Sequence, residues 1–184
     1  MKKNIKVAID SPAAAGAGTQ AKLISKHYNL FQLDTGRCYR FIANIKLKQP
    51  SKYNYKWVKK KIRKLVHAFQ IKCAYYPPKK YNGSCLDGRD ICSVIVPDAD
   101  FKFFITANTK TRALRRYKEL RGSNKTISFN EVLKSIKKRD KSDYNRKVSP
   151  LKKTRDSILI NTSNLTKRAC FLKIKSIMDR KIKN

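Results

Sequence analysis

The segment IDSPAAAGAGTQAK, residues 9–22, has the residue types of a loop that binds phosphate. Such loops need small residues so that successive backbone N–H groups can approach the oxygens, and Gly16 and Gly18 lie among alanines here. Asp10 precedes the turn, and Thr19 offers a hydroxyl that could face Mg²⁺. An apolar run precedes the loop and a helix-like run follows it, so the loop lies where a helix N-terminus would favour an anion.

Two parts of a phosphate loop are missing from this segment. Ser11 stands where the first glycine belongs, and Ala17 stands where a lysine would reach the terminal phosphates. Loss of a comparable preorganised donor removes roughly 3–4 kcal/mol of transition-state stabilisation. Turns of small residues also follow strands in proteins that bind no nucleotide, so the loop alone leaves both interpretations open.

Three further segments combine arginine with aspartate, namely LDTGRCYR at 33–40, DGRDICSVIVPDAD at 87–100 and RDKSDYNRKVSPL at 139–151. Each has a simpler interpretation when taken alone. The first could be a strand end with an exposed arginine, and the second a turn with an internal ion pair. The third could be a solvated helix in which Arg139 and Asp143 pair four residues apart.

In this order behind the loop, the three segments resemble bacterial cytidylate kinase, the family that moves a phosphoryl group from ATP to CMP or dCMP. The resemblance covers most of the chain outside residues 42–84. It implies an α/β P-loop kinase fold, with a five-stranded parallel sheet flanked by helices and an arginine-rich lid. It also implies one domain, 1–184, made of a core (1–41, 85–122 and 151–184), a monophosphate-binding region (42–84) and a lid (123–150).

The resemblance also implies roles for residues that match the family. ATP with Mg²⁺ would bind the loop of Ser11, Pro12, Ala13, Ala14, Ala15, Gly16, Ala17, Gly18 and Thr19, with Thr19 toward the metal. The monophosphate would contact Thr35, Tyr39, Arg40, Arg89, Asp90, Arg139, Asp143 and Arg146. Among these, Arg40 and Arg89 would bind phosphate, Asp90 would face the cytidine and Asp143 would hold the sugar. Arg89, Arg139 and Arg146 would be catalytic, because phosphoryl transfer depends mainly on positioning and on positive charge.

Two departures from the family limit what the resemblance implies. The first is Ala17 in place of the loop lysine, and we expect the cations Arg115 and Arg116 to offset part of this loss. The second departure is one of length. The chain between Phe41 and Ser84 is shorter than the family's monophosphate-binding region, so base specificity is less well determined than the fold. These departures leave open a slow, broadened or inactive kinase.

The elements that must position these residues follow from the hydrophobic pattern, in which strands alternate with helices as in a parallel α/β sheet. Strands are predicted at 5–9, 31–34, 101–106 and 157–160. Helices are predicted at 19–28, 35–48, 52–69, 110–121 and 165–182. Residues 71–76 and 84–90 are predicted as extended chain around a turn at 77–83. Charge is dense in residues 123–150, which we expect to be exposed and mobile.

Helical spacing predicts which side chains face the core. The predicted stripes are Ala21, Leu23, Ile24 and Tyr28; Cys38, Phe41, Ile42 and Ile45; Val58, Ile62, Leu65, Val66 and Phe69; and Cys170, Phe171, Ile174, Ile177 and Met178. His27 and His67 have no acidic or nucleophilic neighbour in the sequence, so we interpret them as surface or packing residues. The five cysteines show neither zinc-ligand nor disulfide spacing.

The charge of the chain has two explanations. With 45 Lys and Arg against 12 Asp and Glu, the net charge of +33 is typical of proteins that bind nucleic acid. Scattered lysines also arise from a compositional bias, which we favour because the excess follows no motif. The alternative function is therefore a non-catalytic basic protein that binds nucleotides or nucleic acid, the latter only nonspecifically. With no apolar run near 20 residues, we expect a cytoplasmic monomer without a membrane segment.

Overall fold

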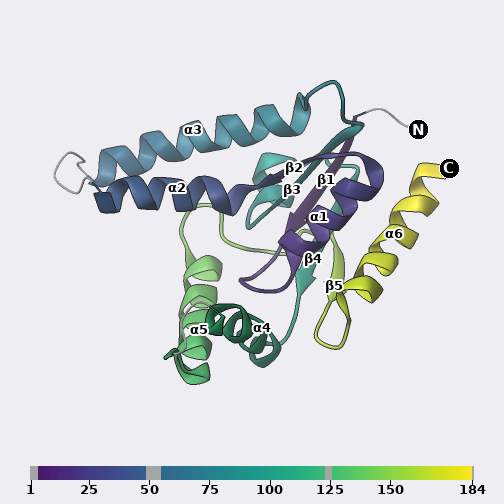
Figure 1. Cartoon of the computed structure of the whole chain (residues 1–184). Helices are drawn as coiled ribbons and strands as arrows, with labels where there is room; N and C mark the ends of the chain where they lie inside the picture. The colour runs from purple at the N-terminus through teal and green to yellow at the C-terminus, as the bar shows by residue number, and fades with distance from the viewer. Residues whose placement is uncertain (1–3, 49–54, 123–125, 184) are drawn as a thin grey trace.

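One sheet of five parallel strands forms the centre of the molecule, in the order β2-β3-β1-β4-β5 (Figure 1). The computed structural model describes residues 4–48, 55–122 and 126–183. The strands are β1 (Ile5–Asp10), β2 (Phe31–Asp34), β3 (Gly83–Gly88), β4 (Phe101–Thr106) and β5 (Ile158–Asn161). The predicted α/β class and the five-stranded parallel sheet are confirmed.

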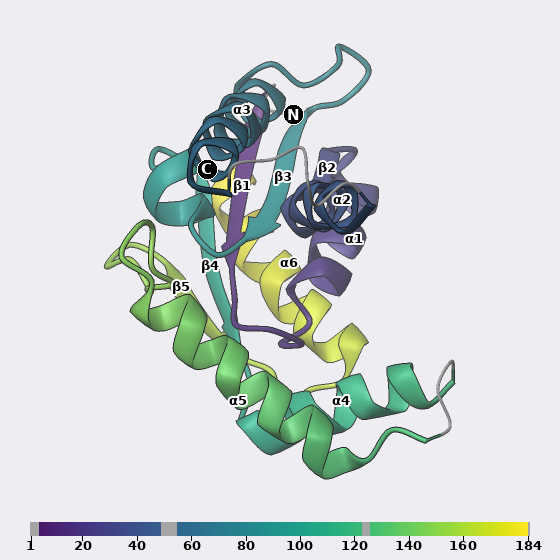
Figure 2. The ribbon, with the colours of Figure 1, turned by 90° about the vertical axis from the view of Figure 1, so that its left-hand side faces the viewer.

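Helices connect the strands and cover the sheet. They are α1 (Ala17–Tyr28), α2 (Thr35–Lys48), α3 (Tyr55–Tyr75), α4 (Thr109–Arg121), α5 (Phe129–Asn145) and α6 (Lys167–Lys183), with a short π-helix, η2 (Ile91–Ile95). Helices α1 and α6 lie side by side on one face of the sheet, whereas α4 and α5 lie beyond its end (Figures 1 and 2).

Alternation along β1 explains the two layers of the core. Val7 and Ile9 point to the face covered by α1 and α6, where Ile24 and Ile174 are fully buried. Ala8, between them in sequence, belongs to the other face and packs with η2 and the end of α3. Side chains of a strand point alternately to opposite faces, so a run of apolar residues predicts a strand that is buried on both faces.

The last predicted helix is confirmed with its core face. Cys170, Ile174 and Met178 are buried, and Phe171 and Ile177 pack against them as partly buried residues. On α1, the predicted stripe is confirmed at Ala21, Ile24 and Tyr28, which are buried, while Leu23 is partly exposed.

The prediction of extended chain at 71–76 is wrong, because α3 continues to Tyr75. Val66, Gln70 and Ala74 are spaced four apart and are all buried, so one continuous helical face packs on the sheet. Gln70 and Ala74 carried no hydrophobic signal strong enough to extend the predicted helix. The turn therefore begins only after Tyr75 and leads directly into β3.

Two predicted core stripes are only partly correct. Phe41 on α2 is 67% exposed, and Leu65 and Phe69 on α3 are 62% and 48% exposed, so these positions do not face the core. The reason is that α3 packs through the face of Val66. The side chains of Ile42, Ile45 and Val58 lie outside the described residues, as does the predicted helix end at Pro50.

The expectation that residues 123–150 are exposed is also wrong in part, because two of their apolar side chains are buried. Helix α5 occupies most of this segment, and Ser128 and Glu131 form a reciprocal capping box at its start. Val132 and Ile136 are buried against Ala113 of α4. Two apolar residues at helical spacing therefore suffice to dock α5, although most of its surface is charged and exposed.

We predict that Ile136→Ala loosens α5 without disturbing the sheet. Ile136 is 4% exposed, and truncation of a buried isoleucine removes about 2–3 kcal/mol of stability at such sites. Backbone amide exchange should accelerate in residues 129–145 and stay unchanged in β1. Lys137→Ala, an exposed substitution on the same helix, is the matched control. Equal exchange in both variants would show that Ile136 does not dock α5.

Candidate active site

The loop between β1 and α1 is held in an unusual backbone conformation. Ala14 has φ 58° and Gly16 has φ 95°, so two alternate residues lie in the left-handed region. Successive N–H groups of such a segment converge to form a concave anion site. Helix α1 begins at Ala17, directly behind the loop, and its positive end adds to this preference for anions.

Asp10 anchors the start of the loop. It is fully buried, and its carboxylate accepts hydrogen bonds from the amides of Ile91 at 2.8 Å and Cys92 at 2.9 Å. Burial raises the pKa of Asp10 to about 6, although these two bonds oppose the shift. Asp10 therefore ties the end of β1 to η2 and does not face the cavity described below.

The loop lacks the lysine side chain of a complete phosphate loop. Ala17 is buried and cannot supply that ammonium. Thr19, two residues further along α1, carries the hydroxyl of the loop and is exposed. Its predicted role toward the metal stays a prediction.

A single open cavity of about 2040 Å³ joins the loop to the other predicted site residues. All nine loop residues from Ser11 to Thr19 line it. So do all eight residues predicted for the monophosphate, which are Thr35, Tyr39, Arg40, Arg89, Asp90, Arg139, Asp143 and Arg146. The cavity exceeds the volume of roughly 300–1,000 Å³ that a single small ligand needs, so it has room for two nucleotides.

Two carboxylates that sequence reasoning did not identify lie at the same edge of the sheet. Asp34 ends β2, Asp87 lies near the end of β3, and the two are paired in register. Burial, and then the charge of Asp34, raise the pKa of Asp87 to about 7. Oδ1 of Asp87 is buried without a hydrogen-bond partner in the described part of the chain. A cation bound beside Asp87 would remove the repulsion between the carboxylates of Asp34 and Asp87.

Arg40 and Thr35 surround these carboxylates. Arg40 pairs with Asp34 at 2.8 Å, and the hydroxyl of Thr35 donates to the carbonyl of Asp87 at 2.7 Å. The glycine at position 88 is required here, because a Cβ atom would lie 2.7 Å from the Thr35 hydroxyl oxygen. Arg40 therefore lines the cavity and is partly neutralised by Asp34, while its predicted role on the phosphate stays a prediction.

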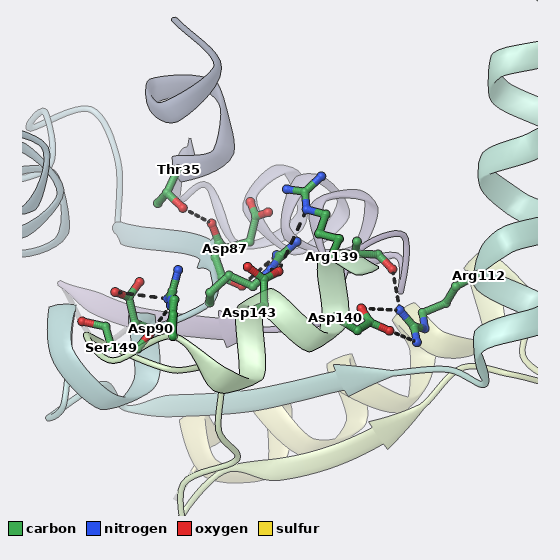
Figure 3. A network of polar contacts seen from close by, with 12 residues as sticks. Thr35, Asp87, Asp90, Arg112, Arg139, Asp140, Asp143 and Ser149 are labelled. Carbon is green, nitrogen blue, oxygen red and sulfur yellow. Dashed lines mark hydrogen bonds and ion pairs between the residues drawn. The ribbon is translucent and has the colours of Figure 1, made fainter. Parts of the chain in front are cut away.

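Asp143 of α5 connects the predicted lid to the centre of the site (Figure 3). It accepts a hydrogen bond from Nε of Arg89 at 2.8 Å and lies 4.0 Å from Nε of Arg139. Partial burial and the charge of Arg89 are the main causes that lower the pKa of Arg139, and Arg40 and Arg116 add to the shift. One carboxylate thus faces two arginines, and the excess positive charge favours an anion.

A second cluster surrounds Asp90, which is 4% exposed. Its Oδ2 atom lies 3.6 Å from Arg146, 3.7 Å from His67 and 3.8 Å from Arg63, which are all too long for hydrogen bonds. Each of these four side chains has a buried polar atom that forms no hydrogen bond within the described residues. Unsatisfied buried groups are costly, so the cluster is suited to a ligand that bonds with them.

Sequence reasoning missed two members of this cluster. Arg63 lies on α3 within a lysine-rich run, and nothing in that run distinguished it from the solvated lysines. His67 was interpreted as a packing residue without an acidic neighbour, which is wrong, because Asp90 lies beside it. Their spacing of four residues on α3 was the available signal.

Arg115 and Arg116, expected to offset the missing lysine at position 17, both lie at the cavity but have different partners. Arg115 lines the cavity, but its guanidinium is bound to Thr162, at 2.9 Å to the hydroxyl and 2.6 Å to the carbonyl. Arg116 also lines the cavity, and it pairs with Glu119 at 3.0 Å on the exposed side of α4. Sequence reasoning missed Arg112, which is buried behind the loop.

Comparison with known proteins shows which family this chain is similar to. The family model described as cytidylate kinase matches residues 7–83 and 57–180. A cytidylate kinase of Clostridium botulinum (strain Loch Maree) is 38% identical over 215 aligned positions, which cover 96% of this chain and 99% of that protein. One from Bartonella bacilliformis is 35% identical and covers 96% and 95%. Because 215 positions exceed the 184 residues here, the Clostridium relative contains segments that this chain lacks.

Solved structures of lower identity share the fold. An uncharacterized protein from Eubacterium ventriosum has a TM-score of 0.66 at 18% identity, covering 96% of this chain and 99% of that one. A gluconokinase from Sinorhizobium meliloti has a TM-score of 0.55 at 7% identity, covering 98% and 97%. The predicted P-loop kinase fold is confirmed.

Among the described residues, no helix combines the length and the apolar character that crossing a bilayer requires. The ordered motifs, the shared cavity and the near full-length matches agree, and the chain belongs to the cytidylate kinase family.

Proposed function

We propose that the chain transfers the γ-phosphoryl group of ATP to CMP or dCMP, giving CDP or dCDP. The observation that carries this proposal is the cavity in which loop amides, strand-end carboxylates and arginines from five segments of the chain meet. Phosphoryl transfer requires two phosphates to be aligned and their charge to be neutralised, with little covalent chemistry from the protein.

The ATP phosphates would bind at the loop and at the N-terminus of α1. Arg89, Arg139 and Arg146 would neutralise the transferring group. Asp143 would keep Arg89 and Arg139 together until the phosphates replace it as the partner. Each guanidinium can donate two parallel hydrogen bonds to a phosphate, which makes arginine better suited than lysine to this geometry.

The cluster around Asp90 is complementary to cytosine. A carboxylate accepts hydrogen bonds from the exocyclic amino group, while a guanidinium such as that of Arg63 donates to the ring nitrogen and the carbonyl oxygen. Uracil presents a carbonyl oxygen in place of the amino group, and a carboxylate repels it. A site built for a donor discriminates strongly against a ligand that lacks it.

The residues present fit a magnesium ion at Asp87. Magnesium prefers oxygen ligands and is commonly held by one or two carboxylates together with substrate phosphates. Asp87 has an unpartnered oxygen and Asp34 lies beside it. A Cβ atom at Gly18 would be 3.5 Å from Asp87 Oδ2, so the start of α1 lies beside this carboxylate. Bound Mg²⁺ would neutralise the β- and γ-phosphates; Thr19 would contribute through water.

The remaining expectations belong to the same proposal. The core would comprise residues 1–41, 85–122 and 151–184, with 42–84 binding the monophosphate and 123–150 acting as the lid. The protein would work as a cytoplasmic monomer and would bind nucleic acid only nonspecifically through its charge. The comparisons do not favour the alternative of a non-catalytic nucleic-acid-binding protein.

An ATP-dependent assay tests the proposal directly. ADP formation is measured with CMP, dCMP, UMP and AMP as separate acceptors, in the presence and absence of Mg²⁺. We expect turnover with CMP and dCMP that requires the metal. A folded protein that forms no ADP with any of the four acceptors would contradict the assignment.

We predict that Ala17→Lys raises the rate at least tenfold. The new ammonium would reach the β- and γ-phosphates, where one preorganised donor is worth roughly 10²–10³ in rate. The measurement is the turnover number at saturating ATP and CMP. Ala68→Lys on the exposed side of α3 adds the same charge away from the cavity and is the control. An unchanged rate in Ala17→Lys would mean that the phosphates do not lie along this loop.

We predict that Asp90→Asn reduces the preference for CMP over UMP. An amide can present either its oxygen or its nitrogen, so it no longer rejects the uracil carbonyl. The ratio of kcat/KM for the two acceptors should fall by about tenfold or more, since each discriminating bond is worth about 1–3 kcal/mol. Asp179→Asn, on α6 and outside the cavity, is the control. If the ratio stays constant, the base lies elsewhere.

A further inference from the structure

Two carbonyl groups of the phosphate loop are fixed by side chains from distant parts of the chain. Nη1 of Arg112, on α4, donates to the carbonyl of Ala13 at 3.1 Å. The hydroxyl of Thr162, which follows β5, donates to the carbonyl of Ala15 at 3.0 Å. The two carbonyls belong to alternate residues of the loop and both bonds are buried.

All five N–H donors of Arg112 are used, although its side chain is only 5% exposed. Besides Ala13, they bind the carbonyl of Ala107 at 2.9 Å and the hydroxyl of Thr109 at 3.2 Å. The remaining two form a bidentate pair with Asp140 of α5, at 3.0 and 2.6 Å (Figure 3). A guanidinium held by five bonds cannot rotate away from the loop.

Thr162 is held in the same way. Arg115 donates to both its hydroxyl and its carbonyl, and the amide of Thr162 donates to the carbonyl of Thr106 at 2.7 Å. Because the hydroxyl accepts from Arg115, its single hydrogen remains available for the carbonyl of Ala15. Arg115, which lines the cavity as a cation, therefore also orients the residue that fixes the loop.

The directions of these two carbonyl groups fix the directions of the amides that follow them. In a trans peptide, the C=O and the N–H of the next residue point in opposite directions. Carbonyls turned toward Arg112 and Thr162 therefore aim the amides of Ala14 and Gly16 the other way. Within the described residues, neither amide donates a hydrogen bond to the protein. Ala14 and Gly16 are also the two residues of the loop that lie in the left-handed region, as an anion-binding concavity requires.

We propose that Arg112 and Thr162 are positioning residues that hold the lysine-free loop in its ATP-binding conformation before ATP arrives. The proposal rests on the proposed function, because it takes ATP to be the ligand of this loop. It explains how an anion site persists without the ammonium, since the amides are already aimed and ATP need not order them. Packing of Ala14 against the α4–α5 cluster supports the same conformation.

The test measures the dissociation constant of ATP by calorimetry without an acceptor, and that of CMP without ATP. Thr162→Val removes the hydroxyl at constant shape, and ATP binding should weaken about fivefold, the worth of one hydrogen bond. CMP binding should change less than about twofold, as its residues do not depend on Thr162. Thr162→Ser keeps the hydroxyl and is expected to restore ATP affinity.

Arg112 is tested with its partner, because a lone buried Asp140 would destabilise the protein. The double variant Arg112→Met/Asp140→Leu replaces the pair by apolar groups of similar size, and ATP binding should weaken by at least about tenfold, since both a bond and an anchor are lost. Lys102→Met/Asp156→Leu removes an ion pair outside the cavity and is the matched control. If the Arg112 variant does not fold, Thr162→Val decides alone.

Equal ATP affinity in wild type and in the folded variants would overturn the inference. Equal losses for ATP and CMP would also overturn it, because they would indicate a general distortion. A wild-type chain that binds ATP but forms no ADP with CMP would overturn the proposed function and leave this inference intact.

Discussion

The pairing of β1 with β3 is the interaction on which the site depends. Its register places Asp10 opposite Gly88, and the amide of Ser11 continues the ladder to the carbonyl of Gly88 at 3.2 Å. The phosphate loop therefore leaves the sheet beside the segment that carries Arg89 and Asp90. Since parallel strands end at the same edge, the residues that follow them share one cavity although they are far apart in sequence.

The central sheet could be predicted because its signal is local. Short apolar runs such as residues 101–106 alternate along the chain with longer segments in which apolar residues recur at helical spacing, as around Ile174. The predicted site residues could be brought together only through the resemblance to a family. Arginine and aspartate near a strand end are too common to indicate a site when each segment is taken alone.

The remaining features are set by tertiary contacts that no local pattern contains. Helix α3 extends past Phe69 because Ala74 packs on the sheet, although the local sequence favours extended chain. Helix α5 forms where charge is dense because two side chains dock it on α4. Arg63 lies among lysines and Arg112 lies close to other arginines, so in the sequence both resemble ordinary surface cations, and only burial and partners distinguish them.

The fixed carbonyls of Ala13 and Ala15 separate the shape of the loop from its chemistry. In a loop whose shape depended on its lysine, replacing that residue would damage folding and reaction speed together. Here the two bonds that fix the loop come from Arg112 and Thr162, and neither involves residue 17, whose methyl group packs in the core instead. A change in charge at position 17 would therefore alter the rate of phosphoryl transfer more than the shape of the loop.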